Sequence, residues 1–368
     1  MVVNFIPLAR PGIDETDIQR AVEVLRSGML VQGKNVNSLE KLFAEYHKVN
    51  HAIALSNGTA TLHLALLAHG IGKGDEVIVP AFSYVATANV VELIGATPVF
   101  VDIDSTTFNI DVQKIEEKIS SKTRAIIPVH EFGLACNIEK VCQLASQYNL
   151  IVIEDAACAL GATQNGKPVG SFGHFGSFSL HPRKSITSGE GGVLLTNNEE
   201  LALKVRALRN HGIDSQKNEM DFIEAGFNYR MTDFQAALVT GQMDRLRSIL
   251  DHKNDIAAIY LSGIRNPLLT LPVVPPGFNH TWQTFHVILA EKMDQKETIA
   301  LLKSKNIGSN YGAQCIPAQS FYKRKYNHDV SRDFPNATTA YTQGLALPIY
   351  DRLSKEEAQY IVNTINNL

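Results

Sequence analysis

The sequence predicts an α/β protein in which a mostly parallel sheet lies between helices and is followed by a smaller α+β domain. Over residues 51–195, short β-branched runs alternate with amphipathic stretches, as in parallel strands joined by helices. The runs are continuously apolar, for example Ile151–Ile153, which is expected where helices cover both faces of a sheet. This alternation then ends. We therefore expect a large domain at 1–244, with the N-terminal segment, and a small C-terminal domain at 245–368.

The elements can be assigned in chain order from these patterns. We expect strands at Ala52–Leu55, Glu76–Val79, Pro98–Val101, Ala125–Val129 and Ile151–Ile153. Between and after them we expect helices at Thr59–Leu67, Thr87–Ile94, Asp111–Ile119 and Ile138–Tyr148. Further on we expect a long helix from Thr232 into Ile249, an extended segment Thr284–Leu289, and helices at Lys296–Lys305 and Lys355–Asn367. Ligands of such sheets bind beyond the carboxyl ends of the strands, so polar residues directly after strands are the candidates.

Composition argues against several classes of function. The 368 residues are 45% hydrophobic and 19% charged, and the formal net charge of -3 gives no basic surplus for nucleic acid. No apolar run reaches the roughly 18–20 residues that cross a bilayer. The first ten residues lack the pattern of a signal peptide, so we expect a cytoplasmic protein without a membrane partner. The four cysteines form no CxxC pair and no HExxH is present, so we expect no metal site and no disulfide.

The first polar turn after a strand is Ser56–Thr61. Its glycine lets a ligand approach the backbone, and its hydroxyls and the start of a helix favour an anion. The turn matches neither the dinucleotide fingerprint nor a P-loop. Taken alone, it is better explained as a plain helix cap.

Glu154 and Asp155 end the strand that begins at Ile151. A carboxylate at that place is suited to hold a protonated ring nitrogen, because opposite charges in contact favour both charged forms. A structural helix cap and a metal ligand remain open alternatives for this pair.

Lys184 lies in Ser179–Gly192, a segment rich in Gly, Ser and Thr between two strand-like runs. A lysine becomes a nucleophile when burial or neighbouring cations lower its pKa. Since a single lysine is far more often a solvated side chain, the evidence lies in the order of the motifs. The Gly-Thr turn comes first, then Asp155 at a strand end, and then Lys184 29 residues later.

This order of motifs resembles the fold-type-I pyridoxal-phosphate (PLP) enzymes, and specifically the DegT/DnrJ/EryC1/StrS sugar aminotransferases. The resemblance implies PLP as cofactor, a PLP-binding large domain with a mostly parallel sheet of the seven-stranded type, and a homodimer with composite active sites. It covers nearly the whole chain. The matching segments are Ser27–Gly33, Ser56–Thr59, Pro80–Thr87, Val129–Gly133, Glu154–Ala157, Ser179–Gly192 and Asn228–Ala237.

The resemblance also implies roles for individual residues. Lys184 would form the covalent linkage to PLP and then act as general acid and base. Asp155 would pair with the pyridine nitrogen and keep the ring an electron sink. Tyr84 matches the aromatic residue that stacks on the ring. The phosphate-binding positions of the family are matched by Gly58, Thr59, Ser179 and, from the neighbouring subunit, Asn228.

Two positions depart from the family pattern. The family usually has Gln or His three residues after the aspartate, near the phenolic oxygen of the cofactor, and this chain has Cys158, a weak donor. The His-Tyr-x-Pro stretch that contacts substrate in relatives appears here as Asn310–Ala313, with Tyr311 as its tyrosine. His181 matches a histidine of relatives that act on UDP-linked amino sugars. Glu131 lies near the expected site, and the sequence suggests no role for it.

The implied reaction moves an amino group from L-glutamate to a 4-keto-6-deoxy sugar linked to UDP or dTDP, for amino sugars of cell-surface glycans such as lipopolysaccharide O-antigen. Gly189–Gly192 resembles the enzymes that aminate C-4, whereas many C-3 relatives carry Tyr-Gly-Asp-Gly-Gly there. A C-3 aminotransferase is therefore one alternative, and a non-catalytic PLP-binding regulator is another. A sugar dehydratase of the same scaffold would have histidine in place of Lys184.

Overall fold

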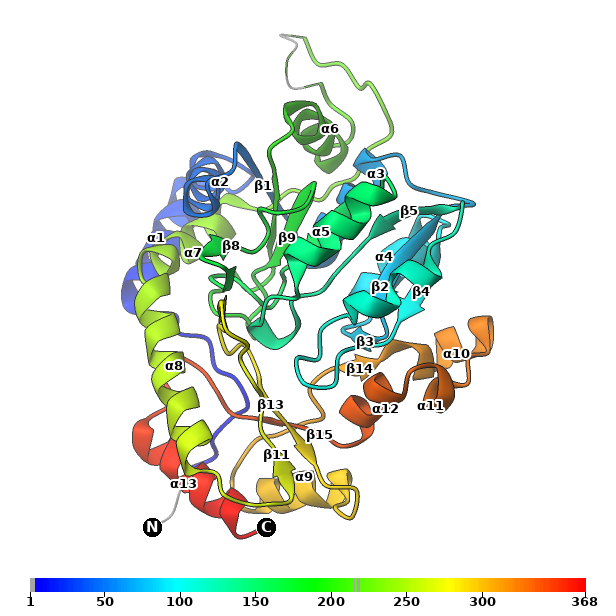
Figure 1. Cartoon of the computed structure of the whole chain (residues 1–368). Helices are drawn as coiled ribbons and strands as arrows, with labels where there is room; N and C mark the ends of the chain where they lie inside the picture. Colours follow the sequence, from blue (N-terminus) through cyan, green and yellow to red (C-terminus); the bar gives the residue numbers. More distant parts are fainter. Residues whose placement is uncertain (1–3, 215, 217–218) are drawn as a thin grey trace.

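The structure is a computed structural model that describes residues 4–214, 216 and 219–368 (Figure 1). Its centre is a seven-stranded sheet of β1 (His51–Leu55), β2 (Glu76–Pro80), β4 (Thr97–Val101), β5 (Thr123–Ile126), β6 (Ile151–Asp155), β9 (Phe175–Ser179) and β10 (Gly192–Thr196). The strands lie in the order β1-β10-β9-β6-β5-β2-β4. All neighbours are parallel except the two pairs made by β10, so the predicted mostly parallel sheet is confirmed.

Alternate residues of each strand enter hydrophobic cores on opposite faces of this sheet, as the pleat requires. In β1, Ile53 and Leu55 pack on one face, and Ala52 and Ala54 pack on the other. The first face is covered by α3 (Gly58–Ala68), α4 (Ala86–Leu93) and α6 (Glu199–Arg209). The second is covered by α2 (Lys34–His47), α5 (Ile138–Gln147) and α7 (Asp233–Asp244), with α1 (Glu15–Ser27) against α7.

A second hydrophobic core forms around a three-stranded antiparallel sheet in the C-terminal part of the chain. The sheet contains β11 (Leu269–Thr270), β13 (Phe285–Leu289) and β15 (Gly344–Leu347). Its helices are α8 (Leu246–Gly263), α9 (Gln295–Ser304) and α13 (Lys355–Asn366). Ile6 of the N-terminal segment packs in this core and bridges to Ile307. Figure 1 shows α8 running from α7 to α13, so one helix joins the two cores.

Part of the C-terminal region packs on the large sheet instead. Strand β14 (Gln314–Cys315) pairs with β3 (Phe82–Ser83), and β12 (Phe278–Asn279) extends the hairpin of β7 (Thr163–Gln164) and β8 (Lys167–Pro168). The helices α10 (Ser320–Tyr326), α11 (Val330–Asp333) and α12 (Pro335–Thr342) follow, and residues of α10 and α12 join the core of the large sheet. The C-terminal region therefore helps to wall the carboxyl end of the large sheet. The division at 244/245 stays a prediction.

Two predicted elements differ from the structure. The expected helix Asp111–Ile119 is a pair of 3-10 turns, η1 (Val112–Lys114) and η2 (Glu116–Lys118). Its apolar residues Val112 and Ile115 are three apart, a spacing that the three-residue turn satisfies as well as an α-helix does. The expected long helix breaks at Arg245, where α7 ends and α8 begins. Within the described ranges, no helix is long and apolar enough to cross a membrane.

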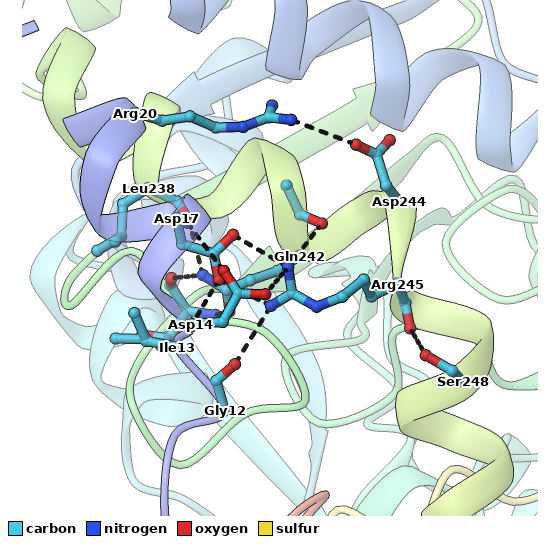
Figure 2. A network of polar contacts seen from close by, with 12 residues as sticks. Gly12, Ile13, Asp14, Asp17, Arg20, Leu238, Gln242, Asp244, Arg245 and Ser248 are labelled. Carbon is cyan, nitrogen blue, oxygen red and sulfur yellow. Dashed lines mark hydrogen bonds and ion pairs between the residues drawn. The ribbon is translucent and has the colours of Figure 1, made fainter. Parts of the chain in front are cut away.

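The break at Arg245 is held by ion pairs and hydrogen bonds to the N-terminal part of the chain (Figure 2). The Arg245 guanidinium donates to both carboxylate oxygens of the buried Asp17, at 3.2 and 2.7 Å, and lies 2.8 Å from Asp14. Asp14 and Asp17 form the capping box that starts α1. A Cβ at Gly241 would lie 2.6 Å from Asp17 Oδ1, so glycine is what lets α7 approach α1 this closely. The polar network thus links α1, α7 and α8.

Candidate active site

A cavity of about 770 Å³ lies at the carboxyl ends of β5, β6 and β9. This is the place that the topology of a parallel sheet predicts for a ligand. The cavity also takes residues from the C-terminal region, among them Gln283 and Asn310. The residues expected from the sequence that line it are Gly58, Thr59, Tyr84, Asp155, Cys158, Ser179, His181, Lys184 and Tyr311.

Lys184 stands in the loop that connects β9 to β10. Its backbone N–H donates to the His181 carbonyl at 2.8 Å, and its Nζ donates to Cys158 Sγ at 3.0 Å. Thr187 closes the base of the loop by donating to the Leu180 carbonyl at 2.7 Å. The loop therefore presents a half-buried primary amine to the cavity from a fixed backbone, which is the arrangement a nucleophilic lysine requires.

Asp155 is buried at the end of β6. Burial raises the pKa of its carboxyl, and the donors Thr87 Oγ1 at 2.8 Å and the Ala157 N–H at 3.2 Å oppose that shift, as does the charge of Lys184. Hydrogen bonds of this kind stabilise the ionised form. The residue is thus a carboxyl group fixed on the cavity wall, with donors that favour its ionised form.

Glu154, the neighbour of Asp155, has a structural role. It is fully buried and accepts hydrogen bonds from the N–H groups of Gly170, Phe172 and Gly173, at 2.7, 2.7 and 2.8 Å. His130 Nδ1 accepts from the Cys136 N–H, so its Nε2 carries the proton that is donated to Glu154 at 3.0 Å. Burial favours a raised pKa of Glu154, and these donors lower it overall.

His130 and Glu154 therefore satisfy each other in the core. Among the described residues, no group of three or more His, Cys, Asp or Glu side chains is placed to hold a metal ion. This arrangement does not support the interpretation of Glu154 and Asp155 as metal ligands.

The start of α3 lies at the cavity. The Asn57 side chain caps the helix by accepting from the Ala60 N–H at 2.8 Å, and the first N–H groups of a helix have no partner within it. A Cβ on Gly58 would lie 2.9 Å from Ser179 Cβ, so glycine allows the helix start to meet the end of β9. Both the cap and the anion readings of the Ser56–Thr61 turn are compatible with this geometry.

The remaining predicted residues lie at the cavity mouth or outside it. Tyr84 is 66% exposed, Tyr311 is also exposed, and His181 is half-buried, with a pKa lowered mainly by burial. Asn228 is exposed, bridges to Asn210 through its backbone, and does not line the cavity, although its neighbour Tyr229 does. The structure of one chain therefore does not bring Asn228 into the site.

Several polar residues in the cavity wall have no role predicted from the sequence, among them Thr87, Glu131 and Gln283. Thr87 and Gln283 were not singled out, and Glu131 was noted without a function. Gln283 donates to the Arg183 carbonyl at 3.0 Å and so reaches the lysine loop from the C-terminal region. The sequence could have indicated Glu131 and Thr87, because both come after strands. It could not have indicated Gln283, which reaches the site only through tertiary packing.

The donor set of this cavity fits PLP. A primary amine that can bind the aldehyde (Lys184), a buried carboxylate for the ring nitrogen (Asp155) and a helix start for the phosphate (Gly58) lie on one cavity wall. PLP bound there would supply an electron sink for carbon-centred proton transfer. Assignment of roles to single residues remains a prediction.

Comparison with known proteins agrees with the site. The family model of the DegT/DnrJ/EryC1/StrS aminotransferases matches residues 11–366. The chain is 37% identical to a GDP-perosamine synthase of Caulobacter vibrioides, covering 99% of this chain and 98% of that one. It is 34% identical to a UDP-4-amino-4-deoxy-L-arabinose–oxoglutarate aminotransferase of Shewanella sediminis, again over 99% and 98%.

A solved structure agrees as well. Spr1654 of Streptococcus pneumoniae in its PLP form superposes with a TM-score of 0.92 at 31% identity, over 99% of this chain and 98% of the other. The predicted fold type, cofactor and enzyme class are thereby confirmed. The chain belongs to the DegT/DnrJ/EryC1/StrS aminotransferase family and is a PLP-dependent sugar aminotransferase.

Proposed function

We propose that this enzyme transfers the amino group of L-glutamate to C-4 of a nucleotide-linked 4-keto-6-deoxy sugar, for the synthesis of amino sugars of surface glycans such as lipopolysaccharide O-antigen. The observation that carries the proposal is that Lys184 and Asp155 both line a cavity of about 770 Å³. Cavities of roughly 300–1,000 Å³ accommodate ligands of this size.

Different residues of the chain have different roles in the proposed reaction. PLP supplies the electron sink when it is bound. Lys184 takes the proton from the α-carbon of glutamate and later delivers a proton to C-4 of the sugar. Asp155 holds the ring nitrogen in its protonated form, and Tyr84 covers the face of the ring. His181 and Tyr311, at the mouth, contact the sugar nucleotide.

Two relatives support the substrate class. The name of the Shewanella sediminis enzyme includes a 4-amino sugar on UDP, and also oxoglutarate, which is the keto acid of glutamate. The Caulobacter vibrioides enzyme is named for a GDP sugar. The sequence predicts a sugar linked to UDP or dTDP, and sugars linked to GDP are therefore included in the test. The Gly189–Gly192 segment supports C-4 over C-3.

We also propose that the enzyme works as a homodimer with composite active sites. Asn228 is exposed and lies next to Tyr229, which lines the cavity. An exposed asparagine beside the mouth of the cavity is available to the site of a second copy related by a two-fold axis.

The proposal is tested in two steps. L-Glutamate alone is added to the holoenzyme, and the absorbance of bound PLP should give way to that of the amine form as 2-oxoglutarate appears. The amine form is then mixed with 4-keto and 3-keto sugars on UDP, dTDP and GDP, and the product is identified by NMR. An unchanged spectrum with glutamate would point to the regulator, and nitrogen at C-3 would contradict the proposed position.

A further inference from the structure

Glu131 is a carboxyl group on the cavity wall that no assigned role explains. It follows β5 and begins the 3-10 turn η3 (Glu131–Gly133). Its backbone N–H donates to Asn109 Oδ1 at 2.8 Å, and the next residue, Phe132, has a left-handed φ of 56°. Phe132 is stacked on His286, with 4.5 Å between ring centroids. The backbone that carries Glu131 is thus fixed on both sides.

The Glu131 carboxyl is buried and incompletely satisfied. The residue is 4% exposed, and its Oε2 has no hydrogen-bond partner among the described residues. Burial, and then the charge of Asp155, raise its pKa to about 7, against the opposing effects of Lys184 and Ser83. An unpaired oxygen on a cavity wall is uncommon, because a buried polar group without a partner costs roughly 1–3 kcal/mol. Because the residue lines the cavity, a group bound there is a candidate partner for this oxygen.

The sheet order shows which part of a bound cofactor this oxygen would face. Asp155 on β6 is the partner of the ring nitrogen. Of the two phosphate-binding positions, Gly58 follows β1 and Ser179 lies at the end of β9. Glu131 follows β5, on the opposite side of β6 from β9 and β1. In PLP the carbon that binds lysine lies between the phosphate arm and the phenolic oxygen. The side away from the phosphate therefore carries the phenolic oxygen.

The residue at the family's usual donor position cannot serve this oxygen well. Cys158 is a weak donor, and burial raises the pKa of its thiol. Its Sγ already accepts the Lys184 Nζ at 3.0 Å. The cavity wall thus has a weak donor where relatives have an amide or imidazole, and a carboxyl with one unpaired oxygen in the turn that follows the adjacent strand β5.

We propose that the Glu131 carboxyl, in its protonated form, donates the hydrogen bond to the phenolic oxygen of PLP. The inference rests on the proposed function only in taking PLP to be bound through Lys184. Glu131 is then a cofactor-tuning residue, and together with Cys158 it replaces the single donor of relatives.

The pH dependence of the Lys184–PLP linkage tests this role without any substrate. The negative phenolic oxygen stabilises the protonated linkage, and a donor that shares its charge weakens that effect. Removing a neutral donor therefore raises the pH midpoint of the linkage absorbance, whereas removing an anion lowers it. The titratable groups that face Glu131 are Asp155, Cys158 and Lys184, with His280 and His286 beyond Phe132, and the single variants leave all of them in place.

Three variants of the holoenzyme are titrated beside the wild type. Glu131→Leu should raise the midpoint by about one pH unit, the size of a lost hydrogen bond to a charged group. Glu131→Gln keeps an N–H donor and should shift it by less than about half of that. Glu291→Gln is the control, because Glu291 is exposed and does not line the cavity, and it should leave the midpoint in place.

A fourth variant guards against a general disturbance of the site. In Glu131→Leu combined with Cys158→Gln, the family's usual donor is restored, and the midpoint should return toward the wild-type value. A lowered or unchanged midpoint in Glu131→Leu would overturn the inference. A wild type that forms no linkage absorbance would instead show that the proposed function has failed.

Discussion

At the scale of single residues, most of the side chains that the sequence singles out line the same cavity. Lys184, Asp155 and Gly58 could be predicted because each lies at a strand end or in the loop that follows one, in a motif that resembles the family's. The function of Glu131 could not be predicted in this way, because its proposed role depends on Asp155 at the end of the adjacent strand β6 and on the weak donor Cys158. A residue whose task is set by its neighbours across the sheet leaves no pattern along the chain.

Asp155→Asn should leave PLP bound but lower the rate of the glutamate half-reaction on the order of 10²–10³-fold, because the charge that keeps the ring nitrogen protonated is lost. Thr87→Val, which removes only the 2.8 Å hydrogen bond to Asp155, should cost about tenfold or less. Stopped-flow absorbance measures both rates. A rate for Asp155→Asn within about threefold of the wild type would remove this residue from the mechanism.

Lys253 of α8 offers a prediction about stability and pH. It is 3% exposed, donates to Ser185 at 3.2 Å, and has a pKa lowered to about 7, chiefly by burial. The folded pKa lies below the unfolded value of about 10.4, so the unfolded state binds the extra proton between pH 7 and 10. The lowered pKa therefore reduces the free energy of unfolding. This reduction is complete below about pH 7 and disappears as the pH rises to 10.

Lys253→Met removes this reduction along with one hydrogen bond, so the free energy of unfolding should rise by about 2–4 kcal/mol at pH 7 and its increase toward pH 10 should flatten. Urea unfolding at constant PLP concentration from pH 7 to 10 measures the effect. Lys41→Met, at an exposed lysine of α2, is the control and should change little. A destabilised Lys253→Met with an unchanged pH slope would mean that Lys253 is charged in the folded protein.

At the scale of elements, the continuous apolar runs and the helices between them were predictable, because burial on both faces of a sheet leaves a clear signal. The 3-10 turns at Val112–Lys114 and Glu116–Lys118 were mistaken for a helix, because a spacing of three suits both structures. The break at Arg245 was missed for another reason. The arginine at the break pairs with Asp17, 228 positions away in the chain, and no local pattern predicts such a contact.

Arg245→Met should lower the free energy of unfolding by about 2–4 kcal/mol, because it leaves the carboxylate of Asp17, which has no exposed surface, without its charge partner. Arg247→Met is the matched control two residues further along α8. Arg247 is 89% exposed and pairs with Asp251 one turn away, so its loss should change the free energy by less than about 0.5 kcal/mol. Equal, small effects in the two variants would show that the α1 capping box alone stabilises Asp17.

At the scale of the whole molecule, the parallel sheet and the second core at the C-terminal end follow the predicted architecture. Two long-range features were beyond the sequence argument. Ile6 joins the C-terminal core, and residues around Cys315 pack against the large sheet through β14 and β3. Both depend on where the chain returns in space. The second also contributes to the cavity, since Asn310–Gln314 lines it.

The proposed composite site predicts complementation between two inactive variants. Lys184→Ala and Asn228→Ala should each be impaired alone. After subunit exchange, a mixed dimer carries both lesions in one site and leaves the other intact, so random reassortment should restore about a quarter of the wild-type activity. Native mass spectrometry verifies exchange. Activity that stays at the average of the two separate variants would mean that Asn228 acts only within its own chain.

The central claim is that Lys184 carries the cofactor and that an amino acid releases it, and borohydride trapping tests both parts in one measurement. Borohydride fixes PLP covalently to the lysine that binds it, and peptide mass spectrometry then locates the label. We predict the label on Lys184 in the resting holoenzyme, and its loss when L-glutamate is added before borohydride, because the amine form of the cofactor has no bond to the enzyme. A label on another lysine, or a Lys184 label that glutamate does not diminish, would contradict the account.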